Sequence, residues 1–184
     1  MRYIFTTLIL VFLSSCNNDN GFLINGTIDA IDDTKVYILQ ADQNNQPFIK
    51  DSTLVKSNQF SFKGISATPE ISYIQVEGVN GYVLAILEKG EITADIDKNN
   101  ISKSTVFGTV SNDDFVKYKL ETKSLVDNMN SIASSAQDAV MNGDVATAKE
   151  LEKDYNKKER EVLLYEWDFI IDNLDSYMSA LLLE

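Results

Sequence analysis

A single cysteine, Cys16, follows a short apolar stretch at the N-terminus. Arg2 supplies a positive charge ahead of this stretch, residues 3–13 are mostly apolar, and Ser14 and Ser15 are small. This order is typical of a bacterial lipoprotein signal, in which the signal is cleaved and the sulfur of the new N-terminal cysteine is acylated. We therefore predict a signal peptide over residues 1–15 and lipidation of Cys16.

A transmembrane helix and an ordinary cleaved signal both fit the N-terminal stretch less well. A transmembrane helix needs about 20 apolar residues, whereas polar residues begin here at Ser14. An ordinary cleaved signal needs no cysteine at the cleavage point. We therefore expect a protein of the cell envelope that is anchored by lipid in the outer rather than the inner membrane and faces the periplasm.

The composition excludes several kinds of catalytic site. The chain has no histidine and no cysteine besides Cys16. Histidine is the commonest general base and metal ligand, so Ser-His-Asp, Cys-His and histidine-based zinc sites are excluded. Once Cys16 is acylated, no thiol remains for disulfide exchange. We predict that the protein is not an enzyme and holds neither a cofactor nor a metal.

Carboxylates supply the remaining candidate chemistry. Residues 95–100 carry oxygen-bearing side chains at the first, third and fifth positions of a calcium loop, but Asn100 and Val106 stand where that loop needs glycine and glutamate. A second acidic cluster, at residues 29–33, is explained by the preference of aspartate for turns. We therefore assign neither a calcium site nor a catalytic carboxylate pair.

The chain is strongly acidic. Its formal charge is −12, and removal of residues 1–15 takes away Arg2 and no acid, which changes the charge to −13. An acidic surface opposes binding to nucleic acid and to anionic lipid. We therefore expect no nucleic acid partner, and we expect membrane attachment through the acyl chains on Cys16.

The first half of the folded chain has a β pattern. Residues 16–21 are polar and are predicted to form a tether. Eight short segments then show the composition or the alternation of strands. They span residues 22–28, 34–40, 51–55, 59–63, 72–76, 82–87, 91–97 and 105–109. Because turn signals and no helical pattern separate them, we predict an antiparallel β-sandwich of about seven or eight strands over residues 22–110.

The hydrophobic period changes after Gly108. Ser111 is predicted to cap a helix, because an acidic residue follows it at the third position and an apolar series begins just beyond. From Phe115 to Ala136 the apolar positions recur at steps of three and four residues, which is one face of a helix. The pattern therefore predicts one long amphipathic helix.

A helix break and a second helix follow. Residues 142–144 combine a glycine, which suits a helix end, with an aspartate that can cap the next helix. We predict a second helix over residues 145–173 and a further helical segment over residues 176–183. The fold class is thus β-rich, with a helical hairpin and a C-terminal helical segment over residues 111–184.

Six segments occur in a recognisable order over residues 22–115: FLINGTI, TKVYIL, KDSTLVKSNQFSFKG, ISYIQV, LEKGEITADID and VFGTVSNDDF. They resemble an uncharacterised β-rich domain of bacterial envelope lipoproteins that usually precedes a thioredoxin-like thiol–disulfide oxidoreductase domain. NLDSYMSALLL resembles the stretch before that second domain. The thioredoxin-like domain and its Cys-x-x-Cys motif are absent here. The resemblance therefore transfers no redox residue, and it implies either a stand-alone accessory protein or a truncated remnant of an oxidoreductase.

The end of the second predicted helix is apolar on most sides. Trp167 lies there near Phe169, Ile170 and Leu174, which is more apolar surface than one helix face buries against a sandwich. We predict that these residues form a docking surface, for a second copy of the chain or for a thioredoxin-like domain. Burial of the same side chains in the chain's own core is the alternative.

The resemblance and the lipoprotein signal lead to a functional expectation. Together they imply a lipid-anchored envelope protein with a non-catalytic interaction or positioning domain. The alternative is a lipoprotein that binds a glycan or a peptide, for which Tyr37, Tyr73, Tyr82 and Phe107 could supply an aromatic face. Packing between strands is the simpler role for those aromatic residues.

Overall fold

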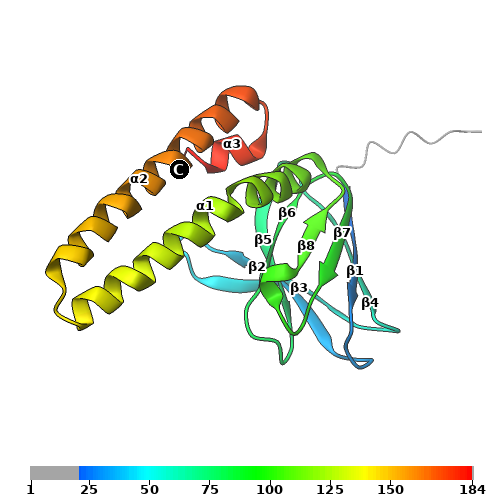
Figure 1. Ribbon diagram of the computed structural model, residues 1–184. Coiled ribbons are helices and arrows are strands. Elements are labelled where there is room, and N and C mark those ends of the chain that lie inside the picture. The colour runs from blue at the N-terminus through cyan, green and yellow to red at the C-terminus, as the bar shows by residue number, and fades with distance from the viewer. Residues whose placement is uncertain (1–20, 184) are drawn as a thin grey trace, which may run out of the picture.

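The computed structural model of the chain describes residues 21–183, and the chain runs from strands to helices (Figure 1). The strands are β1 (Gly21–Ile28), β2 (Lys35–Ala41), β3 (Pro47–Leu54), β4 (Gln59–Ile65), β5 (Glu70–Val76), β6 (Val83–Leu87), β7 (Gly90–Ile96) and β8 (Thr105–Phe107). The helices are α1 (Val110–Met141), α2 (Val145–Asp172) and α3 (Tyr177–Leu181), with a 3-10 turn, η1, at Ile101–Lys103. The prediction of a β-rich fold with a helical hairpin at its C-terminal end is confirmed.

The strands form two four-stranded sheets. Sheet A has the order β4-β1-β7-β8, and sheet B has the order β3-β2-β5-β6. All neighbours pair antiparallel except β1 and β7, which are parallel. The predicted sandwich is confirmed, and the parallel β1–β7 pair is a feature that the prediction of an antiparallel sandwich did not include. Alternation along a strand does not report the direction of its neighbour, and the chain between β1 and β7 is long enough to return to the same end of the sheet.

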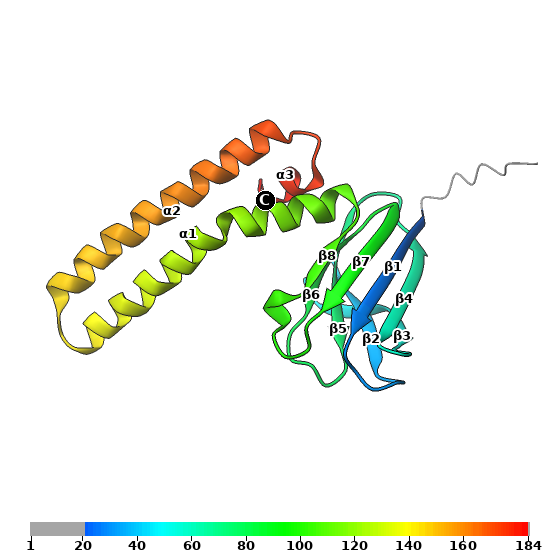
Figure 2. The same cartoon turned by 45° about the vertical axis from the view of Figure 1, so that its right-hand side comes forward.

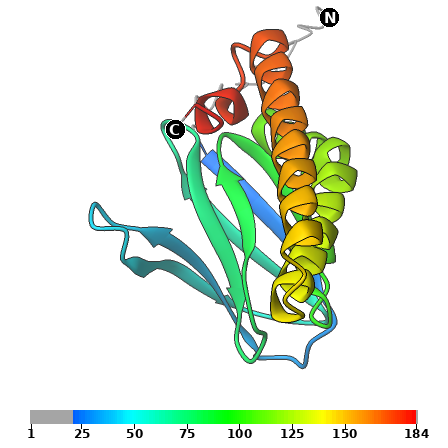
Figure 3. The ribbon, with the colours of Figure 1, turned by 60° about the vertical axis from the view of Figure 1, so that its left-hand side comes forward.

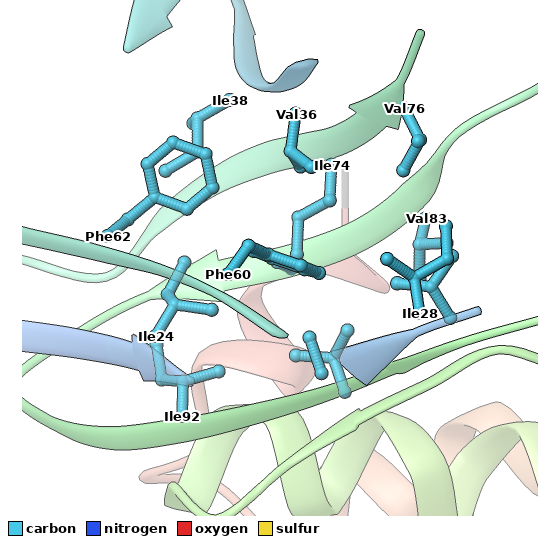
Figure 4. Packing of buried hydrophobic residues seen from close by; sticks show 14 of the residues in the cluster. Ile24, Ile28, Val36, Ile38, Phe60, Phe62, Ile74, Val76, Val83 and Ile92 are labelled. Carbon is cyan, nitrogen blue, oxygen red and sulfur yellow. The ribbon is translucent and has the colours of Figure 1, made fainter. Parts of the chain in front are cut away.

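Apolar side chains from both sheets meet between them and form the core (Figure 4). On β7 the alternation places Ile92, Ala94 and Ile96 inward, as predicted, and on β4 it places Phe60 and Phe62 inward. Sheet B contributes residues such as Ile74, which is almost fully buried. Because one face of each sheet is used in this way, the opposite face of sheet A carries mostly polar residues.

Two phenylalanine–glycine pairs join β1 to β4. The register places Phe22 opposite Gly64 and Gly26 opposite Phe60. A Cβ atom built on Gly26 would lie 2.0 Å from the Phe60 ring, and one on Gly64 would lie 2.6 Å from the Phe22 ring. Each aromatic ring therefore covers the backbone of the facing glycine, and a side chain at either glycine would displace the ring.

Strand β3 is longer than predicted. The sequence indicated residues 51–55, whereas the strand begins at Pro47 and ends at Leu54. It is the outer strand of sheet B, and the β2–β3 hairpin projects from the body of the sandwich (Figure 3). Nearly every residue of β3 is exposed. A strand that packs neither face on the core has no need to alternate, which is why the pattern revealed only part of it.

The helical hairpin begins slightly earlier than predicted. The N-cap of α1 is Thr109, and Ser111 lies within the first turn, so the prediction of Ser111 as the cap is wrong. The break between the helices is where it was predicted. Gly143 has a φ of 73°, which favours glycine, and the Asp144 carboxylate accepts a hydrogen bond from the Thr147 N–H at 3.1 Å.

Candidate functional site

The predicted lipidation site, Cys16, lies outside the described residues, so its lipidation stays a prediction. Gly21 is the first residue of β1. Strand β1 lies in the interior of sheet A, between β4 and β7. A tether over residues 16–20 would therefore be joined to a central strand of the sandwich.

Three carboxylates of the two acidic clusters accept hydrogen bonds. Asp97 accepts hydrogen bonds from the backbone N–H groups of Asn99 and Asn100, at 2.9 and 3.0 Å. Asp95 accepts from the Thr27 hydroxyl at 2.7 Å, and Asp32 accepts from the Ser57 N–H at 2.7 Å. These contacts close turns and join neighbouring strands.

Within residues 21–183, no group of three or more carboxylates is arranged so that it could hold a metal ion. In the same part of the chain, no helix is both long and apolar enough to cross a membrane.

Helices α1 and α2 lie side by side and extend away from the sandwich (Figures 1 and 2). Two tyrosine–glutamate hydrogen bonds connect them. Tyr118 on α1 donates to Glu166 on α2 at 2.6 Å, and Tyr165 on α2 donates to Glu121 on α1. The rings of Tyr118 and Phe169 meet edge to face with centroids 5.9 Å apart. Aromatic packing and paired hydrogen bonds therefore hold the hairpin closed.

Burial and the glutamates make both phenols harder to ionise. Burial and then the Glu121 carboxylate raise the pKa of Tyr165 to about 12. Burial, followed by the hydrogen bond to Glu166 and its negative charge, raises the pKa of Tyr118 still further. Each phenol stays protonated near neutral pH, and its O–H group donates a hydrogen bond to a carboxylate. The two groups are therefore structural partners across the helix interface.

The four predicted docking residues of α2 and its end separate into two pairs. Phe169 and Ile170 are buried, at 4% and 6% exposure, inside the chain's own packing. Trp167 and Leu174 are 56% and 75% exposed. The exposed pair belongs to a series at steps of three, four and three residues, here called the α2 stripe. It consists of Leu164, Trp167, Ile171 and Leu174, all more than half exposed.

Helix α3 folds back onto the hairpin and covers its inner side. The Ser176 hydroxyl donates to Asp114 on α1 at 2.5 Å, and the Ser179 hydroxyl donates to the Asn173 carbonyl at 2.6 Å. Met178 is buried at the contact of α3 with α1 and α2. The predicted last segment is thus packed against the hairpin, whereas the side chains of the α2 stripe stay exposed.

A set of polar contacts, here called the latch, fastens the start of α1 to the sandwich. Asn112 is fully buried, accepts from the Ile86 N–H at 2.9 Å and donates to the Ile86 carbonyl at 2.8 Å. The Glu88 carboxylate accepts from the N–H and the hydroxyl of Ser111, at 2.8 and 2.7 Å. Asn112 pairs with β6 as a neighbouring strand would, and Glu88 satisfies an unpaired N–H at the helix start.

Sequence reasoning missed the latch. The polar run Ser111-Asn112-Asp113-Asp114 is typical of the start of a helix. Because capping explains all four residues, the sequence offered no reason to expect a contact with the sandwich. Asn112 has a second role because β6 leaves a row of backbone groups unpaired at the edge of sheet B. A polar residue on the side of the helix that meets the sandwich would have been the only sequence signal for it.

The four strand aromatics considered for a binding face do not share one. Tyr73 lies on β5, and its ring meets that of Tyr82 edge to face at 4.8 Å. Tyr37 lies on β2, next to β5 in sheet B, whereas Phe107 lies on β8 in sheet A. The structure therefore places Phe107 apart from the three tyrosines.

The outer face of sheet A carries a hollow of about 810 Å³ that the sequence did not reveal. In Figure 2 this sheet faces the viewer, and α1 and α2 lie to its side. Residues of β1, β4 and β7 line the hollow, together with the end of β3 and the turn that follows it. Six of its ten lining residues are polar and uncharged: Asn25, Thr27, Thr53, Gln59, Ser61 and Thr93 contribute amides and hydroxyls.

Residues 22–115 match a protein family described as domain of unknown function DUF4369. The match covers just over half of the chain. The chain belongs to this family.

The DUF4369 match ends inside the first turns of α1. It includes every strand, the hollow on sheet A and all the latch residues, while most of the helical hairpin and the α2 stripe lie beyond it. The latch is therefore the way in which the DUF4369 domain holds the helices that follow. No curated protein and no solved structure matches the chain.

Proposed function

We propose that this protein is a lipid-anchored component of the bacterial cell envelope whose folded part is a non-catalytic interaction and positioning domain. The order Leu13-Ser14-Ser15-Cys16 supports the anchor, and the proposed location is the outer rather than the inner membrane, facing the periplasm. Acylation of the only thiol would leave the chain without a redox group. The DUF4369 domain then serves as a platform from which the hairpin projects.

The α2 stripe is the observation that carries the interaction role. Its four side chains are large and apolar, and all are more than half exposed. Leu164, Trp167 and Ile171 follow one another along one line of α2, and Leu174 lies in the turn just after the helix. Apolar side chains gathered on one surface favour association with a partner. Tryptophan is the residue most often found at the energetic centre of an interface, so Trp167 is the proposed anchor.

The proposed partner is a thioredoxin-like domain, because the segments of this chain resemble a domain that usually precedes one. Self-association through the same stripe is the alternative. In both cases Phe169 and Ile170 do not contact the partner. Their buried side chains hold α2 in the orientation that leaves Trp167 and Leu174 exposed. Their contribution is therefore structural support of the docking surface.

Trp167→Ala tests the proposal, with Leu120→Ala on α1 as the control. Leu120 is 68% exposed and does not belong to the α2 stripe. We expect Trp167→Ala to weaken binding to a purified thioredoxin-like domain, or self-association in sedimentation velocity, by about tenfold or more. Its melting temperature should stay within a few degrees of wild type, because Trp167 contributes little to the core. Leu120→Ala should change neither.

Two results would reject the docking role. One is a wild-type protein that stays monomeric and binds no thioredoxin-like domain at any concentration tested. The other is a large fall in the melting temperature of Trp167→Ala, which would make Trp167 a core residue.

A further inference from the structure

The centre of the outer face of sheet A holds a row of side chains without partners. Residues that face one another across adjacent strands point to the same side of a sheet. The register places Ser61 on β4 beside Asn25 on β1, Asn25 beside Thr93 on β7, and Thr93 beside Phe107 on β8. None of the three polar side chains bonds to another described residue. We call Ser61, Asn25, Thr93 and Phe107 the sheet A row.

The dimensions of the row suit an extended ligand. Neighbouring strands lie about 4.8 Å apart, so four strands place Ser61 and Phe107 roughly 14 Å from each other. Three of the four residues line the hollow of about 810 Å³. Phe107 stands beyond its end and is 38% exposed, which leaves part of its ring accessible. A ligand could lie across the strands and reach all four side chains.

The charge of the hollow restricts the ligand class. Among its lining residues only Lys56 is charged, in a chain whose formal charge is −12. Amides and hydroxyls both donate and accept hydrogen bonds, as the hydroxyl groups of a sugar do. An anionic ligand would be repelled by the rest of the surface. The hollow therefore matches a neutral, polyhydroxylated ligand.

A peptide fits this face less well. Extended peptides bind sheets by adding a strand at an edge, where backbone groups are unpaired. The row lies across the face of sheet A, where the backbone groups are already engaged in pairing between strands. From the row and from the hollow, where Lys56 is the only charged lining residue, we propose that the outer face of sheet A binds neutral saccharide chains.

Affinity electrophoresis of the full chain tests the proposal. The protein is run in a detergent without a sugar headgroup, through gels that contain amylopectin, mixed-linkage β-glucan, galactomannan or arabinoxylan. We expect at least one of these neutral polysaccharides to retard it. Asn25→Ala/Thr93→Ala removes two hydrogen-bonding groups and should weaken binding about tenfold or more. Phe107→Ala should weaken it as well.

Tyr82→Ala is the matched control for Phe107→Ala, because Tyr82 is an exposed aromatic residue next to sheet B. It should bind like wild type. The proposal is overturned if none of the four polysaccharides retards the protein, or if the row variants bind as wild type does. Loss of binding in Tyr82→Ala with retention in the row variants would place the site on the other sheet. Binding of heparin or unfolded casein in place of the neutral chains would also reject it.

Discussion

Single residues between the sandwich and helix α1 contribute more to stability than exposed residues of the same type. Asn112 is the clearest case, because it is fully buried and makes three hydrogen bonds, two to Ile86 and one to the Thr109 hydroxyl. A buried polar group is tolerated only when it is paired. Removing one partner leaves the others unpaired in an environment without water.

Asn112→Ala should therefore destabilise the protein. It leaves the N–H and the carbonyl of Ile86 without their partners, which costs about 2–4 kcal/mol. The free energy of unfolding from urea titration measures the loss. Asn99→Ala is the control, since Asn99 is exposed and its side chain makes no bond to a described residue, so a change below about 0.5 kcal/mol is expected. Equal effects of the two variants would contradict the role of Asn112.

At the scale of elements, two contacts decide how neighbouring segments fit. The phenylalanine–glycine pairs fill the space between β1 and β4 on the core side, and the tyrosine–glutamate pairs join α1 to α2. The phenylalanine–glycine pairs depend on close packing, and the tyrosine–glutamate pairs depend on hydrogen bonds at a partly buried interface. They respond to different perturbations, namely added volume and high pH.

Gly26→Ala tests the first contact. Its new methyl group meets the Phe60 ring, so we expect a loss of about 1–3 kcal/mol in the free energy of unfolding. Introduced together with Phe60→Leu, the same change should cost less, because the flat ring that fills the space above Gly26 is gone. A double-mutant cycle by urea unfolding measures the difference. A cost of Gly26→Ala that is the same in both backgrounds would show that the ring is not the cause.

High pH tests the second contact. Folding raises the pKa of Tyr165 from 10.0 to about 12, and it also raises that of Tyr118. The unfolded chain then loses these protons first, so their stabilising contribution is complete below about pH 10 and is lost as the pH rises toward 12. Compared with Tyr118→Phe/Tyr165→Phe, wild type should lose more stability over this range in urea unfolding. Parallel pH profiles of the two proteins would contradict this.

At the scale of the whole molecule, the proposed attachment to a membrane would most affect its role. The acidic chain would be repelled by an anionic surface, so an anchor must supply the attachment. One acyl chain gives only marginal binding, whereas a multiply acylated cysteine gives a stable anchor. The DUF4369 domain, the latch and the hairpin would then all be held near that membrane.

Cys16→Ser should release the protein from the membrane. The change removes the sulfur that is proposed to be acylated, so labelled fatty acid should no longer be incorporated and the protein should leave the membrane fraction. Asn18→Ser, two residues further along the tether, is the control and should keep both properties. Equal incorporation of label into wild type and Cys16→Ser would disprove lipidation at this position.

Local patterns in the sequence determined which segments of this protein form strands and helices, although the start of β3 and the cap of α1 were predicted wrongly. Alternation on β4 and β7, the series from Phe115 to Ala136, and the break at residues 142–144 all depend on neighbours in sequence, and all recur in the structure. Such features are predictable because propensity, capping and amphipathicity act within a few residues.

Only the tertiary structure decided which elements became neighbours and which side chains stayed exposed. The parallel pairing of β1 and β7 joins strands that are far apart in the chain, and the sheet A row exists only through that register. The end of α2 is apolar on most sides, so its sequence did not show whether Trp167 or Phe169 would face α1. Packing of α1 and α3 against one side of α2 buried Phe169 and left Trp167 in solvent.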